Sequence, residues 1–228
     1  MAMADIAISG INVKSQNQNT APATQNIAYL PLYGVIDQHA SWILELFGGT
    51  STDLFGRAFD MAVADTTVGA VVIDVDSPGG SVYGVQELSD KIYNARDKKP
   101  IIAVVNSMMA SAAYWIASAA DEIIITPGGE AGSIGVIAMH FDYSEAISKA
   151  GVKPTIITAG KYKAEGNPYE PLNSDVKDYF QERVDDYYSA FVGAVARNRG
   201  VKVGVVLSDF GQGRMFGCLL YTSPSPRD

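Results

Sequence analysis

Cysteine and histidine, two of the commonest metal ligands, are scarce in this chain of 228 residues, which has one cysteine and two histidines. The single cysteine, Cys218, excludes an internal disulfide. Together with His39 and His140, it is too little to build a four-ligand zinc cluster. We therefore expect no structural metal and a reducing, cytoplasmic setting.

Basic residues are outnumbered as well, because 17 lysines and arginines face 25 aspartates and glutamates and the net charge is -8. No run of Lys and Arg is long enough to neutralise a row of phosphates, which argues against nucleic acid and anionic membranes as partners. The N-terminus, MAMADIAISGINV, has an acidic residue where a secretion signal has basic ones, and its apolar run is weak. We expect no membrane anchor.

The chain is long enough to bury one full core, and nothing divides it into two regimes of composition. Residues 1–26 include the polar run KSQNQNTAPATQN, and we expect them to form a flexible N-terminal arm. Residues 27–217 are then one domain. The tail, 218–228, continues neither a helical nor a strand pattern, so we expect it to be non-native or disordered.

Charge is missing altogether from residues 101–120, IIAVVNSMMASAAYWIASAA. About 20 apolar residues would span a bilayer, but Asn106, three serines and weakly hydrophobic alanines argue against a membrane span. The stretch divides instead into a strand over 101–105 and a helix over 107–121, with Ser111 near the first turn of the helix. A serine among alanines is usually a packing residue, and the alternative is a nucleophile whose small neighbours admit a substrate.

Apolar, β-branched runs alternate along the chain with segments of helical period. Continuous apolar runs are typical of strands that are covered on both faces. The pattern predicts strands over 27–36, 70–75, 101–105, 122–126, 133–139 and 155–158, and helices over 54–62, 85–95, 142–150 and 174–198. Strands that alternate with helices predict an α/β fold.

Residues 74–84, DVDSPGGSVYG, follow a predicted strand and precede a predicted helix. Pro78 restricts one backbone angle, whereas Gly79 and Gly80 allow a sharp turn that leaves backbone N–H groups unshielded at a helix N-terminus. Such groups can stabilise an oxyanion. A plain strand-to-helix turn explains the same residues equally well, and the motif of a phosphate-binding loop is absent.

A nucleophilic serine needs a base, and the sequence offers two kinds. One kind is a histidine, His39 or His140. The other is a lysine, Lys161 or Lys163, which directly follow the predicted strand at 155–158. A lysine acts as a base only when a water-poor site lowers its pKa from about 10.4 by some three units. From the residues alone, both kinds of base stay open, as does the reading of the lysines as solvated surface residues.

Four motifs, taken together, resemble the signal peptide peptidase A family of serine peptidases, and its phage head-maturation branch in particular. They are SPGG (77–80), MASAAYWIAS (109–118), AGSIGV (131–136) and AGKYKAEGNPYEPL (159–172), in this order and spacing. The resemblance covers residues 27 to about 216. It implies a ClpP/crotonase-like α/β fold of stacked ββα units and a Ser-Lys dyad.

The resemblance also implies a role for individual residues. Ser111 matches the nucleophile and Lys163 the general base, with Lys161 as the second choice. Gly80 and Ala112 match the residues whose backbone N–H groups form the oxyanion hole. Ser133 matches a serine whose hydroxyl orients the lysine. This chemistry requires no metal and no cofactor.

For the whole protein, the resemblance implies cleavage of scaffold and capsid proteins inside a phage prohead, in the host cytoplasm. It also implies a homo-oligomer whose sites combine residues of neighbouring subunits. The alternatives are a peptidase that degrades signal peptides or other proteins, an acyl-CoA enzyme of the same fold, and an assembly scaffold with a vestigial site. After GRMFG (213–217) the sequence departs from the family pattern, so we expect the domain to be truncated at its C-terminus.

Overall fold

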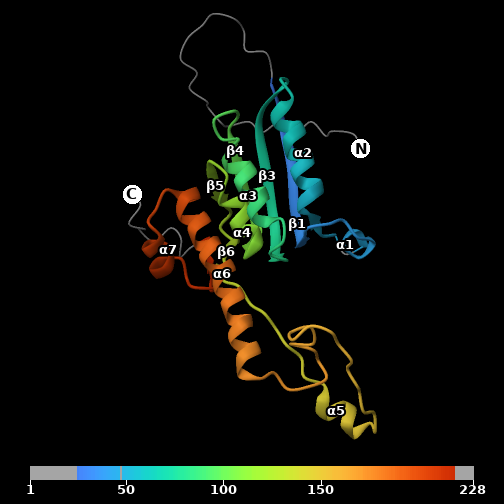
Figure 1. Ribbon diagram of the computed structural model, residues 1–228. Coiled ribbons are helices and arrows are strands. Elements are labelled where there is room, and N and C mark those ends of the chain that lie inside the picture. Colours follow the sequence, from blue (N-terminus) through green and yellow to red (C-terminus); the bar gives the residue numbers. More distant parts are fainter. Residues whose placement is uncertain (1–24, 47, 219–228) are drawn as a thin grey trace, which may run out of the picture.

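A computed structural model describes residues 25–46 and 48–218 of the chain, which form one sheet with helices and a long extension (Figure 1). The strands are β1 (Asn26–Asp37), β2 (Thr50–Ser51), β3 (Val68–Gly80), β4 (Ile101–Ala110), β5 (Glu122–Ile125), β6 (Glu130–Gly132) and β7 (Met215–Gly217). The helices are α1 (Trp42–Leu46), α2 (Thr52–Ala64), α3 (Val85–Tyr93), α4 (Ala112–Ala117), α5 (Ser144–Lys149), α6 (Ser174–Arg199) and α7 (Val203–Asp209).

The sheet has the order β2-β1-β3-β4-β6-β7, and β5 also pairs with β4. All pairs are parallel except β6 with β7. Strand β4 pairs with β5 along its first part and with β6 along its last three residues. Because β1, β3 and β4 run in the same direction, their carboxyl ends lie at one edge of the sheet, where the connecting turns meet.

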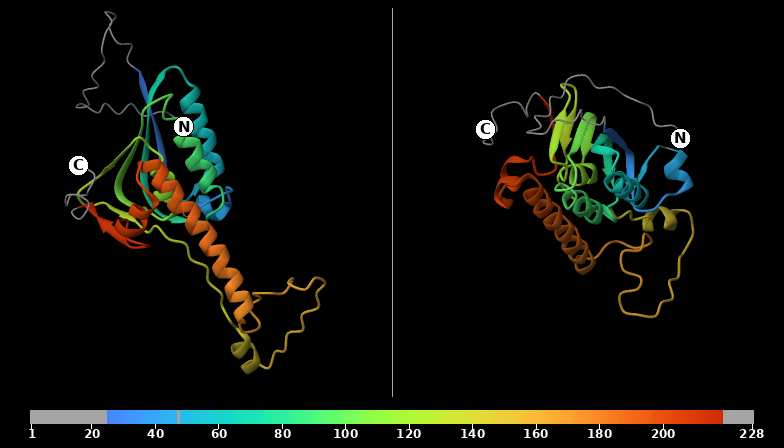
Figure 2. Two further views of the ribbon diagram at one scale, coloured as in Figure 1. Left: turned by 60° about the vertical axis from the view of Figure 1, so that its left-hand side comes forward. Right: turned by 90° about the horizontal axis from the view of Figure 1, so that it is seen from above.

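One face of the sheet packs against helices α2, α3 and α4 (Figure 2). Side chains alternate along the strands, so that Leu32, Ile36 and Ile73 point into this core and are fully buried. Helix α2 adds Phe55 and Phe59 to the core. The C-terminal half of α6 closes it, because Phe191 stacks on Trp115 of α4 at a ring distance of 4.8 Å.

The prediction that the strands are covered on both faces is wrong for the residues that the structure describes. On the second face of the sheet, the exposed fractions of Ile27 and Val35 are 51% and 55%. The hydroxyls of Tyr29 and Tyr33 both donate to the Asp74 carboxylate on this face. Burial, together with that carboxylate, raises the pKa of Tyr33 above its ordinary value. An apolar run in a strand therefore does not report how many helical layers cover the sheet.

The predicted helices are confirmed where caps and periodicity agree. Helix α6 begins after Asn173, whose side chain accepts a hydrogen bond from the Val176 N–H, and ends at Gly200, which has a left-handed backbone. Helices α2, α3 and α5 lie where the periodicity predicts them. Within the described part of the chain, no helix is long and apolar enough to cross a membrane.

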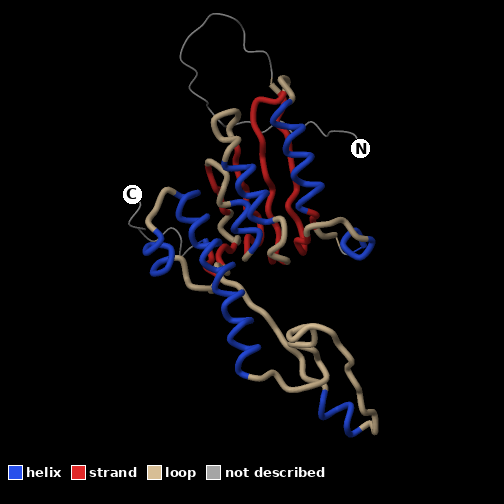
Figure 3. Tube along the Cα trace, in the orientation of Figure 1, coloured by secondary structure: helices blue, strands red, loops and turns tan. Residues whose placement is uncertain are grey.

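The strands predicted at 133–139 and 155–158 are wrong, because neither segment has a neighbouring strand to pair with. Ser133 and Ile134 stay beside the end of β6, where Ile134 is buried in the core. The rest of 133–139 and all of 155–158 belong to residues 136–173, which we call the extension and which projects away from the sheet, with α5 at its tip (Figure 3). Its outgoing and returning limbs hold each other: His140 Nε2 lies 3.0 Å from the Asn167 carbonyl oxygen, and the Tyr143 N–H donates to Pro168 O.

The packing of α2 on the sheet predicts a large difference between two substitutions in that helix. Phe59→Ala should lower the free energy of unfolding by about 3–5 kcal/mol, because the side chain is 1% exposed and its loss leaves a cavity. Met61→Ala, at a side chain that is 74% exposed, should change it by less than about 0.5 kcal/mol. Urea unfolding measures both, and equal losses would show that α2 does not pack as described.

Candidate active site

Ser111 occupies the junction between β4 and α4, with a backbone φ of 53° and ψ of -122°. A non-glycine residue in such a conformation is strained by about 1–3 kcal/mol and persists only where its surroundings hold it. The strand is longer than predicted and continues to Ala110, so Ser111 is the N-cap of α4 and does not lie inside its first turn. The side chain is half-buried, while Ala110 and Ala112 on either side are buried.

Hydrogen bonds from two elements hold the backbone of Ser111. Its N–H donates to the carbonyl oxygen of Gly132, at the end of β6, over 3.0 Å. Its own carbonyl oxygen accepts from the N–H of Trp115, one turn along α4, also over 3.0 Å. The strained conformation therefore depends on a strand that follows Ser111 in the sequence and on the helix that it caps.

Gly79 is the residue before the last in β3 and lies directly against Ser111. The sharp turn predicted at Gly79 and Gly80 is wrong, because the strand continues through Gly80 in its pairing with β1. A Cβ atom on Gly79 would lie 2.7 Å from the Cβ of Ser111 and 2.9 Å from the nitrogen of Ala112, and its φ of +90° favours glycine. Ser77, which is fully buried, fixes this end of β3: its Oγ accepts from the Gly79 N–H and donates to the Gly34 carbonyl oxygen.

The two predicted oxyanion-hole residues, Gly80 and Ala112, flank this contact. Gly80 pairs with Ile36 of β1, and a Cβ atom there would lie 2.0 Å from the Ile36 carbonyl oxygen. Ala112 is the first residue of α4, so its N–H has no acceptor within that helix. The structure therefore brings the end of β3 and the start of α4 together at Ser111.

Ser133, predicted to orient the lysine, follows β6 directly and lies one residue after the acceptor of the Ser111 N–H. It also has a left-handed backbone, with a φ of 55°, and its N–H donates to the Arg214 carbonyl oxygen over 2.8 Å. The strand pairing of β4 with β6 thus places Ser133 beside the junction that carries Ser111.

The structure does not bring Lys163 to Ser111 within one chain. Lys163 is exposed in a turn of the extension, where its N–H donates to the Gly160 carbonyl oxygen. Lys161, the second choice, lies over the ring of Tyr162 in the same turn. Within residues 25–46 and 48–218, no hydrogen bond joins Ser111 to either lysine. The extension that carries them projects away from the sheet (Figures 1 and 2).

The histidines are no closer to forming a triad. His39 Nδ1 lies 2.8 Å from an Asp53 carboxylate oxygen near the start of α2, and the His39 side chain is exposed. His140 is on the outgoing limb of the extension, held to Asn167. In the part of the chain that the structure describes, no cluster of three or more His, Cys, Asp or Glu could hold a metal ion.

Sequence reasoning named Gly79 only for its backbone freedom and missed two residues that shape the site, Ser77 and Gly132. Ser77 stands inside the SPGG motif and Gly132 inside AGSIGV, so the signal was present. What the motifs could not show is which glycine touches Ser111 and which carbonyl group accepts its N–H, because both depend on the strand register.

Comparison with known proteins supports this description of the fold and identifies the family. The family described as Peptidase family S49 matches residues 94–217. Capsid assembly protease C of Escherichia phage lambda is 34% identical over 206 residues, which cover 90% of this chain and 47% of that protein. Head-tail preconnector protein GP5 of Enterobacteria phage P21 is 35% identical over 180 residues, which cover 79% of this chain and 36% of that protein.

Among solved structures, a mutant of the 1510-N membrane-bound stomatin-specific protease aligns with a TM-score of 0.50 and 15% identity, covering 86% of this chain and 74% of that one. The mostly parallel sheet and its helical layer make this an α/β protein, as expected, with a fold like that of the stomatin-specific protease. The chain belongs to peptidase family S49, which confirms the resemblance drawn from its motifs. It spans about half the length of the first of these phage relatives and about a third of the second.

The contact between Gly79 and Ser111 predicts that even a methyl group is excluded at position 79. Gly79→Ala should lower the free energy of unfolding by at least about 2 kcal/mol, because backbone strain and overpacking add. The matched control is Gly193→Ala in α6, where no atom lies within 4 Å of the added carbon; it should raise stability by about 1 kcal/mol. Urea unfolding compares the two, and an unchanged stability of Gly79→Ala would contradict the close contact between Gly79 and Ser111.

Proposed function

We propose that the chain is a serine endopeptidase with Ser111 as nucleophile and Lys163 as general base, and that residues 27–217 are its peptidase domain. The observation that carries the proposal is the strained backbone of Ser111, in contact with Gly79 of β3, in a chain of peptidase family S49. Family motifs matched on this sequence supply the roles of the remaining residues.

In the proposed reaction, neutral Lys163 accepts the proton of Ser111 Oγ while that oxygen attacks a peptide carbonyl carbon. The N–H groups of Gly80 and Ala112 bind the oxyanion of the tetrahedral intermediate. The peptide C–N bond then breaks, the amine leaves with the proton from Lys163, and water hydrolyses the acyl-enzyme. The hydroxyl of Ser133 orients the lysine amine. Neither a metal nor a cofactor is needed for these steps.

We also propose that the site is completed between two copies of the chain in a homo-oligomer. Lys163 is exposed on the extension, and the same extension exposes large apolar side chains, with exposed fractions of 83% for Ile137 and 92% for Ile157. Association would bury this apolar surface. In a closed ring, each copy would give its serine to one site and its lysine to the next.

The proposed substrates are scaffold and capsid proteins inside a phage prohead, in the cytoplasm of the host. Two relatives support this choice, since one is named a capsid assembly protease and the other a head-tail preconnector protein. A peptidase of the same family that degrades signal peptides or other proteins is the nearest alternative, and a capsid scaffold with a vestigial site is the non-enzymatic one.

The dyad predicts that Ser111→Ala and Lys163→Ala each slow cleavage of denatured capsid or scaffold protein by at least about 100-fold, because each removes a group that acts in the transition state. Cleavage is followed on gels. His140→Ala is the control, because His140 lies on the same extension, and it should keep full activity.

Three outcomes would contradict parts of the proposal. Loss of activity in His140→Ala with retention in Lys163→Ala would make a histidine the base. Equal turnover by Ser111→Ala and the unsubstituted protein would remove the peptidase assignment and leave the scaffold reading. Equal cleavage of an unrelated denatured protein would favour a general degrading peptidase.

A shared site predicts that two inactive variants restore each other. When Ser111→Ala and Lys163→Ala are unfolded, mixed equally and refolded together, about a quarter of the sites should contain both functional residues if each site takes one from each of two copies. Activity should therefore return to about a quarter of that of the unsubstituted protein. No recovery in a mixed assembly would show that Ser111 and Lys163 act within one chain.

A further inference from the structure

A buried polar cluster joins α6 to α4 on the side of α4 away from Ser111. Its centre is Asn198, which is 3% exposed, and its other members are Ser89 of α3 and Ser118 at the end of α4, both fully buried. Buried polar groups are costly unless they are paired, so a cluster of this kind fixes the elements that carry it.

The amide of Asn198 divides its two donors between the serines. Nδ2 donates to Ser89 Oγ over 3.2 Å and to Ser118 Oγ over 2.9 Å. Both hydroxyls in turn donate to the carbonyl oxygen of Trp115, over 3.2 and 2.8 Å. The Oδ1 atom of Asn198 accepts from the Arg197 guanidinium. Every hydrogen-bonding group of the Asn198 side chain is thus used.

Trp115 connects this polar cluster to Ser111 by hydrogen bonds. While its carbonyl oxygen accepts from the two serines, its N–H donates to the carbonyl oxygen of Ser111. Its ring stacks on Phe191 of α6. Asn198 is therefore linked to the backbone of Ser111 through the two hydroxyls and one residue of α4.

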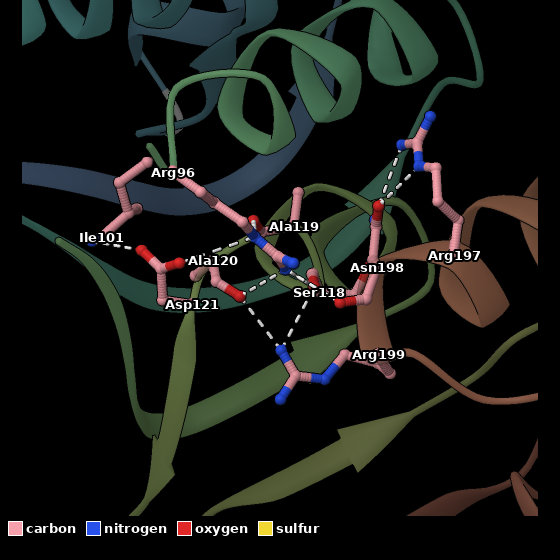
Figure 4. A network of polar contacts seen from close by, with 9 residues as sticks. All are labelled: Arg96, Ile101, Ser118, Ala119, Ala120, Asp121, Arg197, Asn198 and Arg199. Carbon is pink, nitrogen blue, oxygen red and sulfur yellow. Dashed lines mark hydrogen bonds and ion pairs between the residues drawn. The ribbon is translucent and has the colours of Figure 1, made fainter. Parts of the chain in front are cut away.

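Two arginines brace the same end of α4 (Figure 4). Arg96 donates to the carbonyl oxygens of 118, 119, 120 and 198, and Arg199 donates to those of 118 and 120. Asp121 accepts from the N–H of Ile101 at the start of β4, while its own N–H donates to the Ile101 carbonyl oxygen. These bonds join the start of β4 to the segment that follows α4, and Ser111 lies at the opposite end, where β4 meets α4.

We propose that Asn198 is a positioning residue for the nucleophile: through Ser89, Ser118 and Trp115 it holds α4 so that Ser111 keeps its strained conformation. The inference rests on the proposed function of Ser111. It also gives α6 a second role, because the helix that fixes the nucleophile directly continues the returning limb of the extension that carries Lys163. One helix therefore connects the residue that holds α4 to the segment that carries Lys163.

The test is Asn198→Asp, which keeps the shape of the side chain and an acceptor for Arg197 but removes the NH2 donor. Each serine has a single O–H, so a serine that donates to the new carboxylate leaves the Trp115 carbonyl oxygen. We expect kcat for cleavage of a capsid or scaffold protein to fall about 10- to 100-fold, with KM within about twofold, because the nucleophile is displaced while the substrate surface is kept.

The matched control is Lys99→Met. Lys99 also holds the end of a helix, since its Nζ donates to the carbonyl oxygens of Ala62, in the last turn of α2, and of Asp65, which caps it. Among the residues that the structure describes, no hydrogen bond joins its side chain to Ser111. It should lower the melting temperature and leave kcat within about twofold. If Asn198→Asp loses stability like Lys99→Met and keeps its kcat, the hydrogen bonds of Asn198 only stabilise the fold and the proposal is overturned.

Two further measurements keep the result decisive. Hydrogen exchange of the Trp115 amide, which reports its bond to Ser111, should be faster in Asn198→Asp, and unchanged exchange would overturn the link whatever the activity. If Asn198→Asp does not fold, Ser118→Ala removes one donor to Trp115 and should lower kcat by a smaller factor; an unchanged kcat would overturn the proposal. A failure of the proposed function is distinguishable, because Ser111→Ala would then match the unsubstituted protein.

Discussion

The strained backbone of Ser111 is the constraint on which the arrangement of this protein depends. Ser111, between a strand and a helix, donates its N–H to the Gly132 carbonyl oxygen on one side. On the other side it lies against Gly79, where there is no space for a side chain. Both conditions require β3, β4 and β6 to end side by side in one register. The buried Ser77, which ties the end of β3 to Gly34 of β1, extends the same requirement to a fourth strand.

The residues of the proposed active site divide between a packed part and an exposed part of the molecule. Ser111, Gly80, Ala112 and Ser133 stand on the sheet and its helical layer, where buried side chains and hydrogen bonds fix them. Lys163 stands on the extension, whose limbs hold each other but leave apolar side chains exposed. In the proposed oligomer, the rigid half supplies the nucleophile and oxyanion hole, and association brings the base to it.

Sequence patterns performed best where the signal is local. Asn173 and Gly200 mark both ends of α6, because capping involves residues a few positions apart. The same kind of reasoning was wrong for 133–139 and 155–158, whose β-branched runs have the composition of strands but no pairing partner. It also began the helix at residue 107, with Ser111 near its first turn, whereas sheet pairing carries the strand up to Ala110. Pairing is a property of two segments, so one segment cannot report it.

The sequence by itself determined the α/β class, the order of most elements and, through three of its four motifs, the set of residues that gather at Ser111. Only the tertiary structure decided that Gly79 touches Ser111, that Gly132 accepts the Ser111 N–H, and that Asn198 reaches Ser118 from 80 positions away. It also decided that Lys163 stands apart from Ser111. The reason is physical: motifs and caps act through neighbours along the chain, whereas these contacts arise from strand register and helix packing between distant segments.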